Sequence, residues 1–332
     1  MSASRRDFLK ECLSGAVVLG ATGKMGLLAP LPPTPVATKS KVVVAHDDLL
    51  RGVGSAVDSR RVLGLLDRAM QSLLDRDQPL EAWKRLVHPG ERVGLKVNTL
   101  GGRGLSSNAH LVEAICERLQ QAGIKANDIV VWDRDTDEME RSGFRVSIGG
   151  NSVQCFGTDR VDYEQELATF ASVGSRLSRI LTQRCDVLIN VPVLKDHDGA
   201  GVTLALKNMY GVIHNPNKYH PDGCNPYIAD LNMLPEIRSK MRLTICDATT
   251  AQYEGGPAYK PEYSWSPNAL ILSQDPVALD TTGWQTIERK RAERGLKTLE
   301  GDGRKPRYLA TAADGEHRLG TDDPGRISVV EV

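Results

Sequence analysis

A lysine and histidine cluster near the middle of the chain is the first feature that could do chemistry. The run VPVLKDHDGAGVTLALKNMYG, residues 191–211, places Lys-Asp-His-Asp at 195–198 directly after an apolar strand pattern. It then puts Lys207 in a segment that is otherwise nearly apolar. Burying a lysine costs free energy unless a partner or a ligand compensates for its charge. The sequence therefore predicts a functional site here.

Lys207 has a pattern of its own. Four residues recur at a spacing of four and would form one stripe of a helix: Gly199, Thr203, Lys207 and Gly211. Helical side chains lean toward the helix N-terminus, so Lys207 would reach back toward His197. A lysine and a helix N-terminus together suit an anionic group such as a carboxylate or a phosphate. The alternative is an ion pair with an aspartate such as Asp247 or Asp275.

Two histidines and one glutamate are candidates for proton transfer. His197 could be a general base, a metal ligand or a residue that only holds its loop by hydrogen bonds. His220 lies in a long loop that is expected to return toward the same site. Glu254 stands between a tyrosine and two glycines, where a ligand can approach the backbone closely. The spacing of His220 from His214 and Cys224 matches no zinc signature, which favours a surface loop over a metal site there.

The ends of the predicted strands are unusually polar. Carboxyl ends of parallel strands meet at one edge of a sheet, where ligands bind beside helix N-termini. We therefore expect one site to collect the polar residues at these ends: Lys96, Asn98, Asp133, Arg134, Asp135, Lys195, Asp196, His197, Asp198, Asp247, Glu254, Asp275 and Asp280. For Asp275 an N-cap before Pro276 is the simpler alternative, with Asp280 as a first-turn acid of the helix.

The elements that must position these residues alternate between strand and helix. Apolar runs predict strands at 41–45, 92–97, 129–132, 187–191, 243–246 and 269–272, and alternation predicts an edge strand within 326–332. Helix patterns fall at 59–74, 81–86, 108–122, 175–183 and 276–293. This order is typical of an α/β protein with a wound, mostly parallel sheet and helices on both faces. We expect a single domain over residues 38–332.

Composition narrows the classes of partner. Lys plus Arg and Asp plus Glu both total 42, so the formal net charge is zero and no basic field exists to attract nucleic acid. Apart from Cys12 the chain has five cysteines and no C-x-x-C spacing, which argues against a disulfide framework and against a locally encoded ferredoxin-type cluster. A small-molecule ligand or a protein partner fits better.

The N-terminus resembles an export signal. Residues 4–10, SRRDFLK, are similar to the twin-arginine motif and precede 12 uncharged residues, 12–23, and a proline-rich stretch. A membrane span needs about 20 apolar residues, so we predict a signal and linker over residues 1–37 rather than an ordinary span. The alternative is a chance arginine pair. The signal predicts handling by the twin-arginine machinery and a location in the periplasm or outside the cell, with a membrane anchor if the signal is not cleaved.

One glycine motif in this segment is misleading. Residues 20–26, GATGKMG, look like the phosphate-binding turn of a dinucleotide fold. They lead into Leu-Ala-Pro-Leu-Pro-Pro, which cannot form the helix that would receive a pyrophosphate. We therefore predict no NAD site.

Several motifs in order resemble the family catalogued as domain of unknown function 362, from about residue 41 to the C-terminus. They are EAWKRLVHPGERVGLKVNTLGG, LVEAICERLQQAGI, LINVPVLKDHDGAGVTLALKNMYGVI, NKYH, LTICDATTAQYEGGP and LILSQDPVALD. The resemblance implies recurrent residues at Lys195, His197, Lys207, Asn208, His220, Asp247, Glu254 and Asp280. Some relatives carry ferredoxin-type clusters, whose cysteine motif this chain lacks. The sequence also departs from the family pattern at Ala248 and at a shortened loop over 254–257.

Residues and resemblance together predict an exported enzyme that acts on a small anionic substrate. The predicted catalytic residues are His197, Lys195, Lys207 and Glu254. The predicted substrate-binding residues are Lys96, Asn98, Asn208 and His220. A bound metal ion would take its ligands from His197, His220, Asp247 and Glu254. The alternatives are a redox protein that holds a metal or cluster, and a binding protein that captures an anion without turnover.

Overall fold

The central sheet is built from buried, β-branched strands that follow one another in space rather than in sequence. The computed structural model describes residues 39–51 and 56–332, so the predicted signal lies outside the described residues. The sheet order is β13-β1-β12-β10-β7-β2-β3-β4. The strands are β13 (Ile327–Glu331), β1 (Ser40–His46), β12 (Ala269–Ser273), β10 (Met241–Gln252), β7 (Val187–Asn190), β2 (Val93–Lys96), β3 (Ile129–Trp132) and β4 (Gln154–Cys155).

Along this order the strands are mostly parallel, as predicted, and β12 is the exception. The pairs β10–β7, β7–β2, β2–β3 and β3–β4 are parallel, and so is β1–β13 at the edge of the sheet. Strand β12 is antiparallel to both β1 and β10. The expectation of a parallel strand at 269–272 was therefore wrong, and the carboxyl end of β12, with Asp275 after it, lies at the opposite edge of the sheet from the other strand ends.

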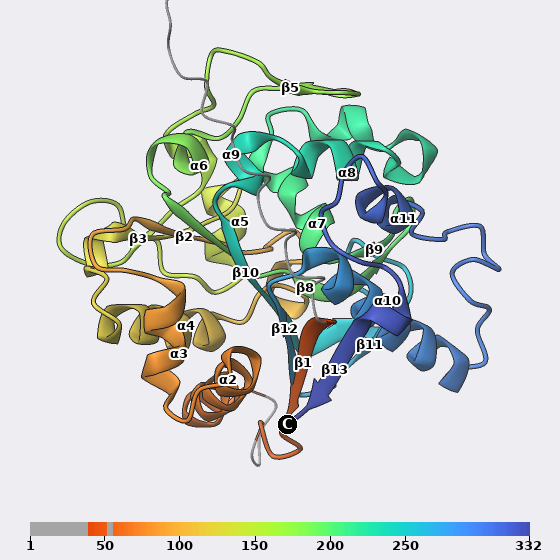
Figure 1. Ribbon diagram of the computed structural model, residues 1–332, viewed down its shortest axis with the longest axis horizontal. Helices are drawn as coiled ribbons and strands as arrows, with labels where there is room; N and C mark the ends of the chain where they lie inside the picture. Colours follow the sequence, from red (N-terminus) through yellow and green to blue (C-terminus); the bar gives the residue numbers. More distant parts are fainter. Residues whose placement is uncertain (1–38, 52–55) are drawn as a thin grey trace, which may run out of the picture. The chain divides into compact units, whose positions relative to one another are not determined.

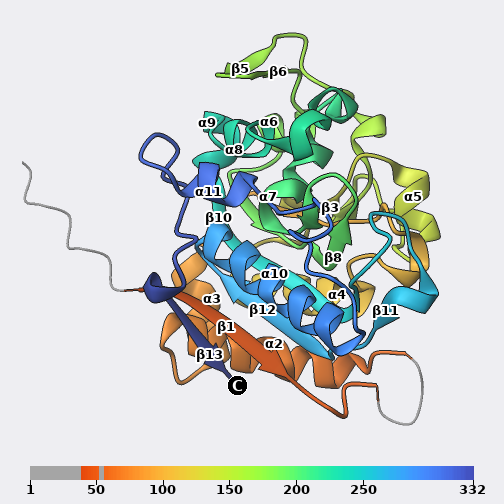
Figure 2. The same ribbon diagram turned by 90° about the vertical axis from the view of Figure 1, so that its right-hand side faces the viewer.

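Helices cover both faces of the sheet (Figures 1 and 2). Helices α2 (Ser59–Leu74), α3 (Pro79–Leu86) and α4 (Ala109–Gln121) pack on one face, and α10 (Pro276–Glu293), α7 (Ala205–Asn208), α8 (Tyr227–Asn232) and α11 (Tyr308–Ala313) belong to the other. Successive strand side chains point to opposite faces, so Val43 joins the α2 cluster while Val42 joins the α10 cluster. Residues 38–332 form one compact unit.

Helix boundaries follow the capping residues. Asn108 caps α4 by accepting a hydrogen bond from the backbone N–H of His110, and Asp275 caps α10 ahead of Pro276. Three predicted helices, at 59–74, 108–122 and 276–293, are confirmed to within one residue at each end. The helix predicted at 175–183 begins only at Arg179 as α6 (Arg179–Gln183), since Ser175 ends strand β6 (Val173–Ser175), which pairs with β5 (Ala168–Phe170).

The helix predicted from the stripe at 199–211 is the main error. Residues 195–197 belong to strand β8 (Val193–His197), which forms an antiparallel hairpin with β9 (Gly201–Thr203). Gly201 has φ +82°, and a side chain there would meet the backbone of Arg304, so this part of the run turns as a hairpin and not as a helix. Helix α7 begins at Ala205 and continues as a 3-10 turn, Met209–Val212.

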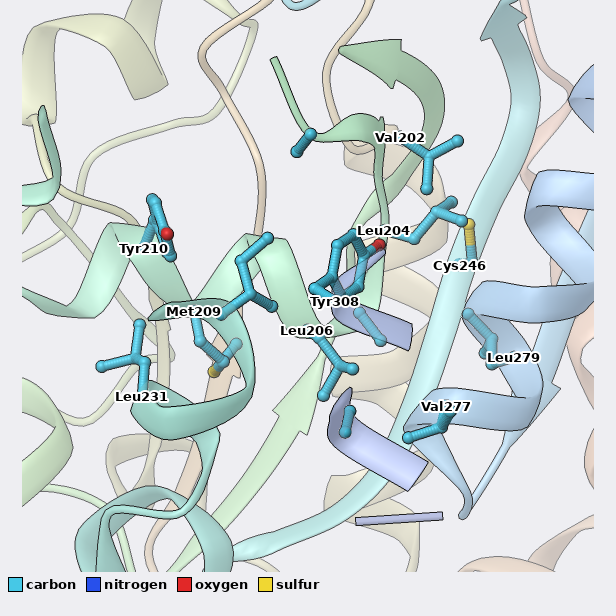
Figure 3. Packing of buried hydrophobic residues seen from close by; sticks show 14 of the residues in the cluster. Val202, Leu204, Leu206, Met209, Tyr210, Leu231, Cys246, Val277, Leu279 and Tyr308 are labelled. Carbon is cyan, nitrogen blue, oxygen red and sulfur yellow. The ribbon is translucent and has the colours of Figure 1, made fainter. Parts of the chain in front are cut away.

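Helix α7 is held firmly despite its shortness. Its leading N–H groups, those of Ala205 and Leu206, donate to the carboxylate of Asp280. Leu206 and Met209 join the same buried cluster as Leu231 and Tyr308 (Figure 3). The remaining helices are α5 (Thr136–Arg141) and α9 (Pro235–Arg238), and strand β11 (Ser264–Trp265) pairs with β10. Over the described ranges, no helix is long and apolar enough to cross a bilayer.

Candidate functional site

A pocket of about 550 Å³ opens where the ends of β2 and β3 meet the β8–β9 hairpin and α7. Its walls include six of the thirteen polar strand-end residues that the sequence singled out. They are Lys96, Asn98, Asp133, Arg134 and Asp135 from the strand ends, His197 and Thr203 from the hairpin, and Lys207, Asn208, Tyr210 and His220 from the segment that follows. The pocket wall therefore carries nitrogen donors together with carboxylates, which also include Glu138 and Asp159.

The hairpin presents three residues on one face. Lys195 and His197 are two apart on β8 and so point to the same side, and Lys195 lies opposite Thr203 across the ladder. All three side chains are buried. Asp196 points to the other side of β8. The motif Lys-x-His is thus explained by strand periodicity: it sends both basic groups toward the pocket side of the hairpin.

One lysine of the pocket has a carboxylate partner. The Nζ atom of Lys96 lies 2.8 Å from Oδ1 of Asp133 and donates to the carbonyl of Val97. Burial lowers the pKa of Lys96, and Asp133 opposes this effect. Asp133 is fixed in turn by the backbone N–H and the hydroxyl of Thr99, which donate to its Oδ2 atom. This pair is electrically balanced.

Lys195 is held by neutral amides. Its Nζ atom donates to Oδ1 of Asn98 at 2.9 Å, and Asn98 donates through Nδ2 to Asn208 at 3.0 Å. Asn208 then donates to Asn190, whose own amide donates to the carbonyl of Ala205. Lys195 has no exposed surface, and burial lowers its pKa to about 8. In the described part of the chain, no carboxylate oxygen lies within 4.0 Å of its ammonium group.

Lys207 also has neutral neighbours. Its Nζ atom lies 3.2 Å from Nε2 of His220 and 3.7 Å from the centre of the Tyr210 ring. The residue is 6% exposed, and burial lowers its pKa to about 8. Within residues 39–51 and 56–332, no aspartate or glutamate forms an ion pair with it. The alternative of a structural ion pair with Asp247 or Asp275 is therefore wrong.

Hydrogen bonds fix the protonation of both histidine rings. Nδ1 of His220 lies 3.1 Å from the carbonyl of Pro216, so it carries the proton and leaves the Nε2 lone pair facing Lys207. Nδ1 of His197 accepts hydrogen bonds from the N–H groups of Gly199 and Ala200, so its proton sits on Nε2. The two rings are stacked with centroids 5.6 Å apart.

His197 remains neutral at physiological pH. Burial, followed by the positive charges of Lys207 and neighbouring groups, lowers its pKa to about 2. Asp198 lies 2.9 Å from Nδ1 and would favour a charged ring, but its carboxylate is mostly exposed and is screened by water. The burial effect therefore prevails. His197 can donate a hydrogen bond through Nε2–H, but it is a weak base.

Thr203 leaves a hydroxyl without a partner. Its Oγ1 atom is fully shielded from solvent and makes no hydrogen bond with any described group, although the residue lines the pocket and is 5% exposed. Buried hydroxyl groups are normally satisfied, and an orphan costs about 1–3 kcal/mol. An unsatisfied hydroxyl opposite Lys195, on a residue that lines the pocket, suits a ligand oxygen.

Comparison with known proteins identifies the family. The model of the domain of unknown function DUF362 matches residues 93–285, which include every pocket residue named above. The chain belongs to the DUF362 family. A thylakoid-associated protein, sll1697, from Synechocystis is 26% identical over 227 residues, which cover 65% of this chain and 68% of that protein. The resemblance seen in the sequence is thus confirmed.

A solved structure from Thermotoga maritima is a more distant match. It shares 11% identity with a TM-score of 0.43, over 71% of this chain and 59% of that chain. The chain thus spans somewhat over half the length of that structure.

Lys195 and four of the predicted carboxylates of this DUF362 protein do not line the pocket. Asp247 accepts hydrogen bonds from the N–H groups of Asn108 and Thr249, within the long strand β10. Asp275 is the N-cap of α10, at the opposite sheet edge. Asp280 caps α7 and accepts a hydrogen bond from Tyr308, and burial raises its pKa to about 7. The structure does not bring these carboxylates to the lysines.

Glu254 is the fourth. Its carboxylate is paired with Arg291 and Arg304, and these pairs hold its pKa below the usual value although burial acts in the other direction. It lies in a charge cluster behind β8. The predicted metal ligands His197, His220, Asp247 and Glu254 are therefore not assembled as a set, and no group of three His, Cys, Asp or Glu side chains in the described ranges could hold a metal ion.

Sequence reasoning overlooked Thr203 and Tyr210 as lining residues. Thr203 was assigned to a helical stripe, although the β-branched pair Val202-Thr203 beside two glycines already favoured a strand. Tyr210 was not singled out at all. Its place three residues after Lys207, which in a helical turn brings the two side chains together, was the available signal.

Proposed function

We propose that this DUF362 protein is an enzyme that binds a small anionic molecule in the pocket and transfers protons to or from the bound molecule. The observation that carries the proposal is Lys207, a buried ammonium group that lines the pocket and has only neutral neighbours among the described residues. A purely structural lysine in such a place would be expected to have a carboxylate beside it. A ligand anion would supply the missing charge.

Three further groups support an anion at this position. Lys195 adds a second positive charge behind Asn98 with no carboxylate partner in the described chain. His197 offers Nε2–H, and Thr203 offers its unsatisfied hydroxyl. Lys96 contributes little net charge, because Asp133 balances it. Hydrogen bonds to charged oxygens in a desolvated pocket are stronger than those between neutral groups.

Proton transfer is assigned to Lys207 and His220. A general acid or base works best when its pKa lies near the operating pH, and the lowered pKa of Lys207, about 8, meets this condition. The Nε2 lone pair of His220 contacts the lysine and can accept its proton. His197 acts instead as a neutral hydrogen-bond donor that orients the anion, and Glu254 takes no part.

Anion binding can be tested by thermal unfolding with added malonate, phosphate and pyruvate at low ionic strength. For the natural chain, the midpoint temperature of unfolding should rise with anion concentration, because a ligand that binds only the folded state stabilises it. The Lys207→Met variant should lose at least tenfold in affinity. Lys84→Met removes an exposed lysine of α3 and should bind as the natural chain does. Equal affinity of all three proteins would refute the proposal.

Turnover separates an enzyme from the second candidate, a protein that captures an anion without changing it. The low basicity of His197 is the observation that favours capture. An enzyme that moves protons should exchange carbon-bound hydrogens of a bound 2-oxo or 2-hydroxy acid with D₂O, as followed by NMR. Binding without exchange across such a panel would leave only the capture function.

A metal-linked or redox role is a weaker candidate, since the described residues do not assemble the predicted ligand set. Elemental analysis of protein purified from its native host tests it directly. Metal at one equivalent that survives dialysis would revive it.

Export by the twin-arginine machinery is proposed from the N-terminal motif alone. The protein would then work in the periplasm or outside the cell, in contact with the membrane only through an uncleaved signal, and without nucleic-acid partners. The relative from Synechocystis is named as thylakoid-associated, which fits work at or beyond a membrane. Replacing Arg5 and Arg6 by lysine should retain the protein inside the cell in a fractionation experiment, whereas unchanged export would contradict the proposal.

A further inference from the structure

We infer that Lys207 forms an imine with the carbonyl carbon of a small oxo acid, with His220 accepting the proton that the amine must lose. The inference rests on the proposed function, because it requires the pocket to bind an anion. It adds the class of substrate, a compound with a carboxylate and a neighbouring ketone or aldehyde, and it adds a covalent step.

The contact between Lys207 and His220 points to more than charge binding. A lysine that only holds an anion would direct its N–H donors at the anion. Here one donor is directed at the Nε2 atom of a histidine, 3.2 Å away. The carbonyl of Pro216 fixes the other ring nitrogen as a donor, so Nε2 is a proton acceptor. Burial lowers the pKa of His220, which keeps this acceptor free of a proton at neutral pH.

The surroundings of Lys207 also favour its uncharged, nucleophilic form. Within the described ranges no carboxylate forms an ion pair with it. The charge of Asp198 favours the ammonium state only from a mostly exposed side chain, and the Tyr210 ring offers weaker compensation than an adjacent carboxylate would. With a pKa lowered to about 8, a substantial fraction of the amine is neutral at pH 7 to 8. An exposed lysine at the same pH is almost entirely charged.

Other groups are available for the carboxylate of the substrate, which leaves Lys207 for the carbonyl. Lys195 supplies charge from behind Asn98, while Nε2–H of His197 and the hydroxyl of Thr203 supply donors. These residues come from the β8–β9 hairpin, whereas Lys207 and His220 come from the segment after it. The pocket therefore has two walls that match the two functional groups of an oxo acid.

The proposed step balances without an added oxidant or reductant. The neutral Nζ atom of Lys207 attacks the carbonyl carbon, a C–N bond forms, and the carbonyl π electrons move to oxygen. His220 takes a proton from the nitrogen and passes it to that oxygen. Loss of the second nitrogen proton to the same oxygen expels water and leaves the C=N double bond. Both protons of the amine end in the water molecule.

Reductive trapping tests the step. The full chain is incubated with pyruvate and sodium cyanoborohydride, which reduces an imine to a stable secondary amine, and the modified residue is located by peptide mass spectrometry. We expect Lys207 to be modified at least tenfold faster than exposed lysines such as Lys84. The Lys207→Arg variant keeps the charge and should show only background modification. The His220→Asn variant should still bind pyruvate but should be trapped several-fold more slowly.

The outcomes separate the inference from the function on which it rests. Binding is measured in parallel by calorimetry with pyruvate and with lactate, which lacks the carbonyl. If both acids bind and Lys207 is not modified above background, imine formation is refuted and anion binding stands. If neither acid binds and Lys207 is not modified, both proposals fail together. Fast modification of Lys207 that persists unchanged in His220→Asn would overturn the role of His220.

Discussion

Buried charged groups on the two faces of strand β8 have different kinds of partner. On the back face Asp196 pairs with Arg304 at 3.0 Å and accepts a hydrogen bond from the N–H of Gly256. Arg304 also pairs with Glu254, which is shared with Arg291. On the front face, Lys195 and His197 flank Asp196 along the same strand. Lys195 meets a neutral amide there, and His197 lines the pocket.

The contrast separates a structural charge cluster from a candidate site. Behind β8 every buried charge has an opposite charge beside it, and these pairs join the hairpin to the loop after β10 and to the end of α10. In front of β8, Lys195, Lys207 and the hydroxyl of Thr203 lack the partners that burial normally demands. Buried charges that are paired with opposite charges stabilise the fold. Buried polar groups that lack such partners beside a pocket can instead be stabilised by a bound ligand.

Removing an arginine from the back cluster should give the largest effect. Arg291 is 1% exposed and donates to two carboxylates and to the carbonyls of Tyr253 and Lys297. Arg291→Met removes these bonds and leaves Arg304 as the remaining cation beside Glu254 and Asp302, so we expect the free energy of unfolding, measured in urea, to fall by about 3 kcal/mol. Arg60→Met, on the exposed side of α2, should change stability by less than about 0.5 kcal/mol. A loss from Arg291→Met no larger than this control would mean that the cluster is not structural.

Replacing Thr203 by valine should have the opposite sign. Valine has nearly the same shape, suits a strand and removes the unsatisfied hydroxyl, so stability should rise by about 1 kcal/mol. Anion affinity should fall, because the hydroxyl is a proposed contact. The matched control is Thr158→Val, where the hydroxyl bonds to Ser178 and stability should fall. If Thr203→Val destabilises the protein as much as the control does, the hydroxyl has a partner within the fold.

Much of this arrangement could be predicted from the sequence, because strand ends of a parallel sheet share an edge. That rule placed Lys96, Asn98 and Asp133 together correctly. It failed for Asp275, since nothing in a five-residue apolar run reveals that β12 runs antiparallel to its neighbours. Direction is decided by the connections between strands, which a local pattern does not contain.

The other wrong predictions, the helix at 199–211 and the site role of Glu254, arose because neighbouring residues in the sequence allowed more than one interpretation. The stripe of Gly199, Thr203, Lys207 and Gly211 fits a helix by its spacing, whereas the left-handed φ of Gly201 within the same run belongs to a hairpin. Glu254 resembled a site residue because its neighbours are aromatic and flexible. Its partners, Arg291 and Arg304, lie 37 and 50 residues away in sequence, so no local signal could reveal the ion pairs.

A pH experiment can sharpen the assignment of His197. Its folded pKa, about 2, lies below the value of 6.5 expected for an unfolded histidine. As the pH falls below 6.5, His197 binds a proton in the unfolded chain but not in the folded chain. The free energy of unfolding therefore falls as the pH decreases from 6.5 toward 2. Between pH 6.5 and 5.5 the natural chain should lose about 1 kcal/mol more than His197→Asn, in urea titrations at both pH values. Equal losses would mean that the folded ring protonates as readily as the unfolded one.

The smallest change in stability is expected for Lys207→Met, and it is the sharpest test of the comparison. Methionine has a similar length and no charge, so the variant relieves the burial of an ammonium group and gives up only neutral contacts with Tyr210 and His220. Unfolding free energy should stay within about 1 kcal/mol of the natural value or rise. Lys96→Met is the matched control. It leaves the carboxylate of Asp133 in the same pocket without its cation, and the free energy of unfolding should fall by about 3 kcal/mol. If the two lysine variants were equally destabilised, Lys207 would be a structural charge like those behind β8, and the reason for placing a ligand beside it would disappear.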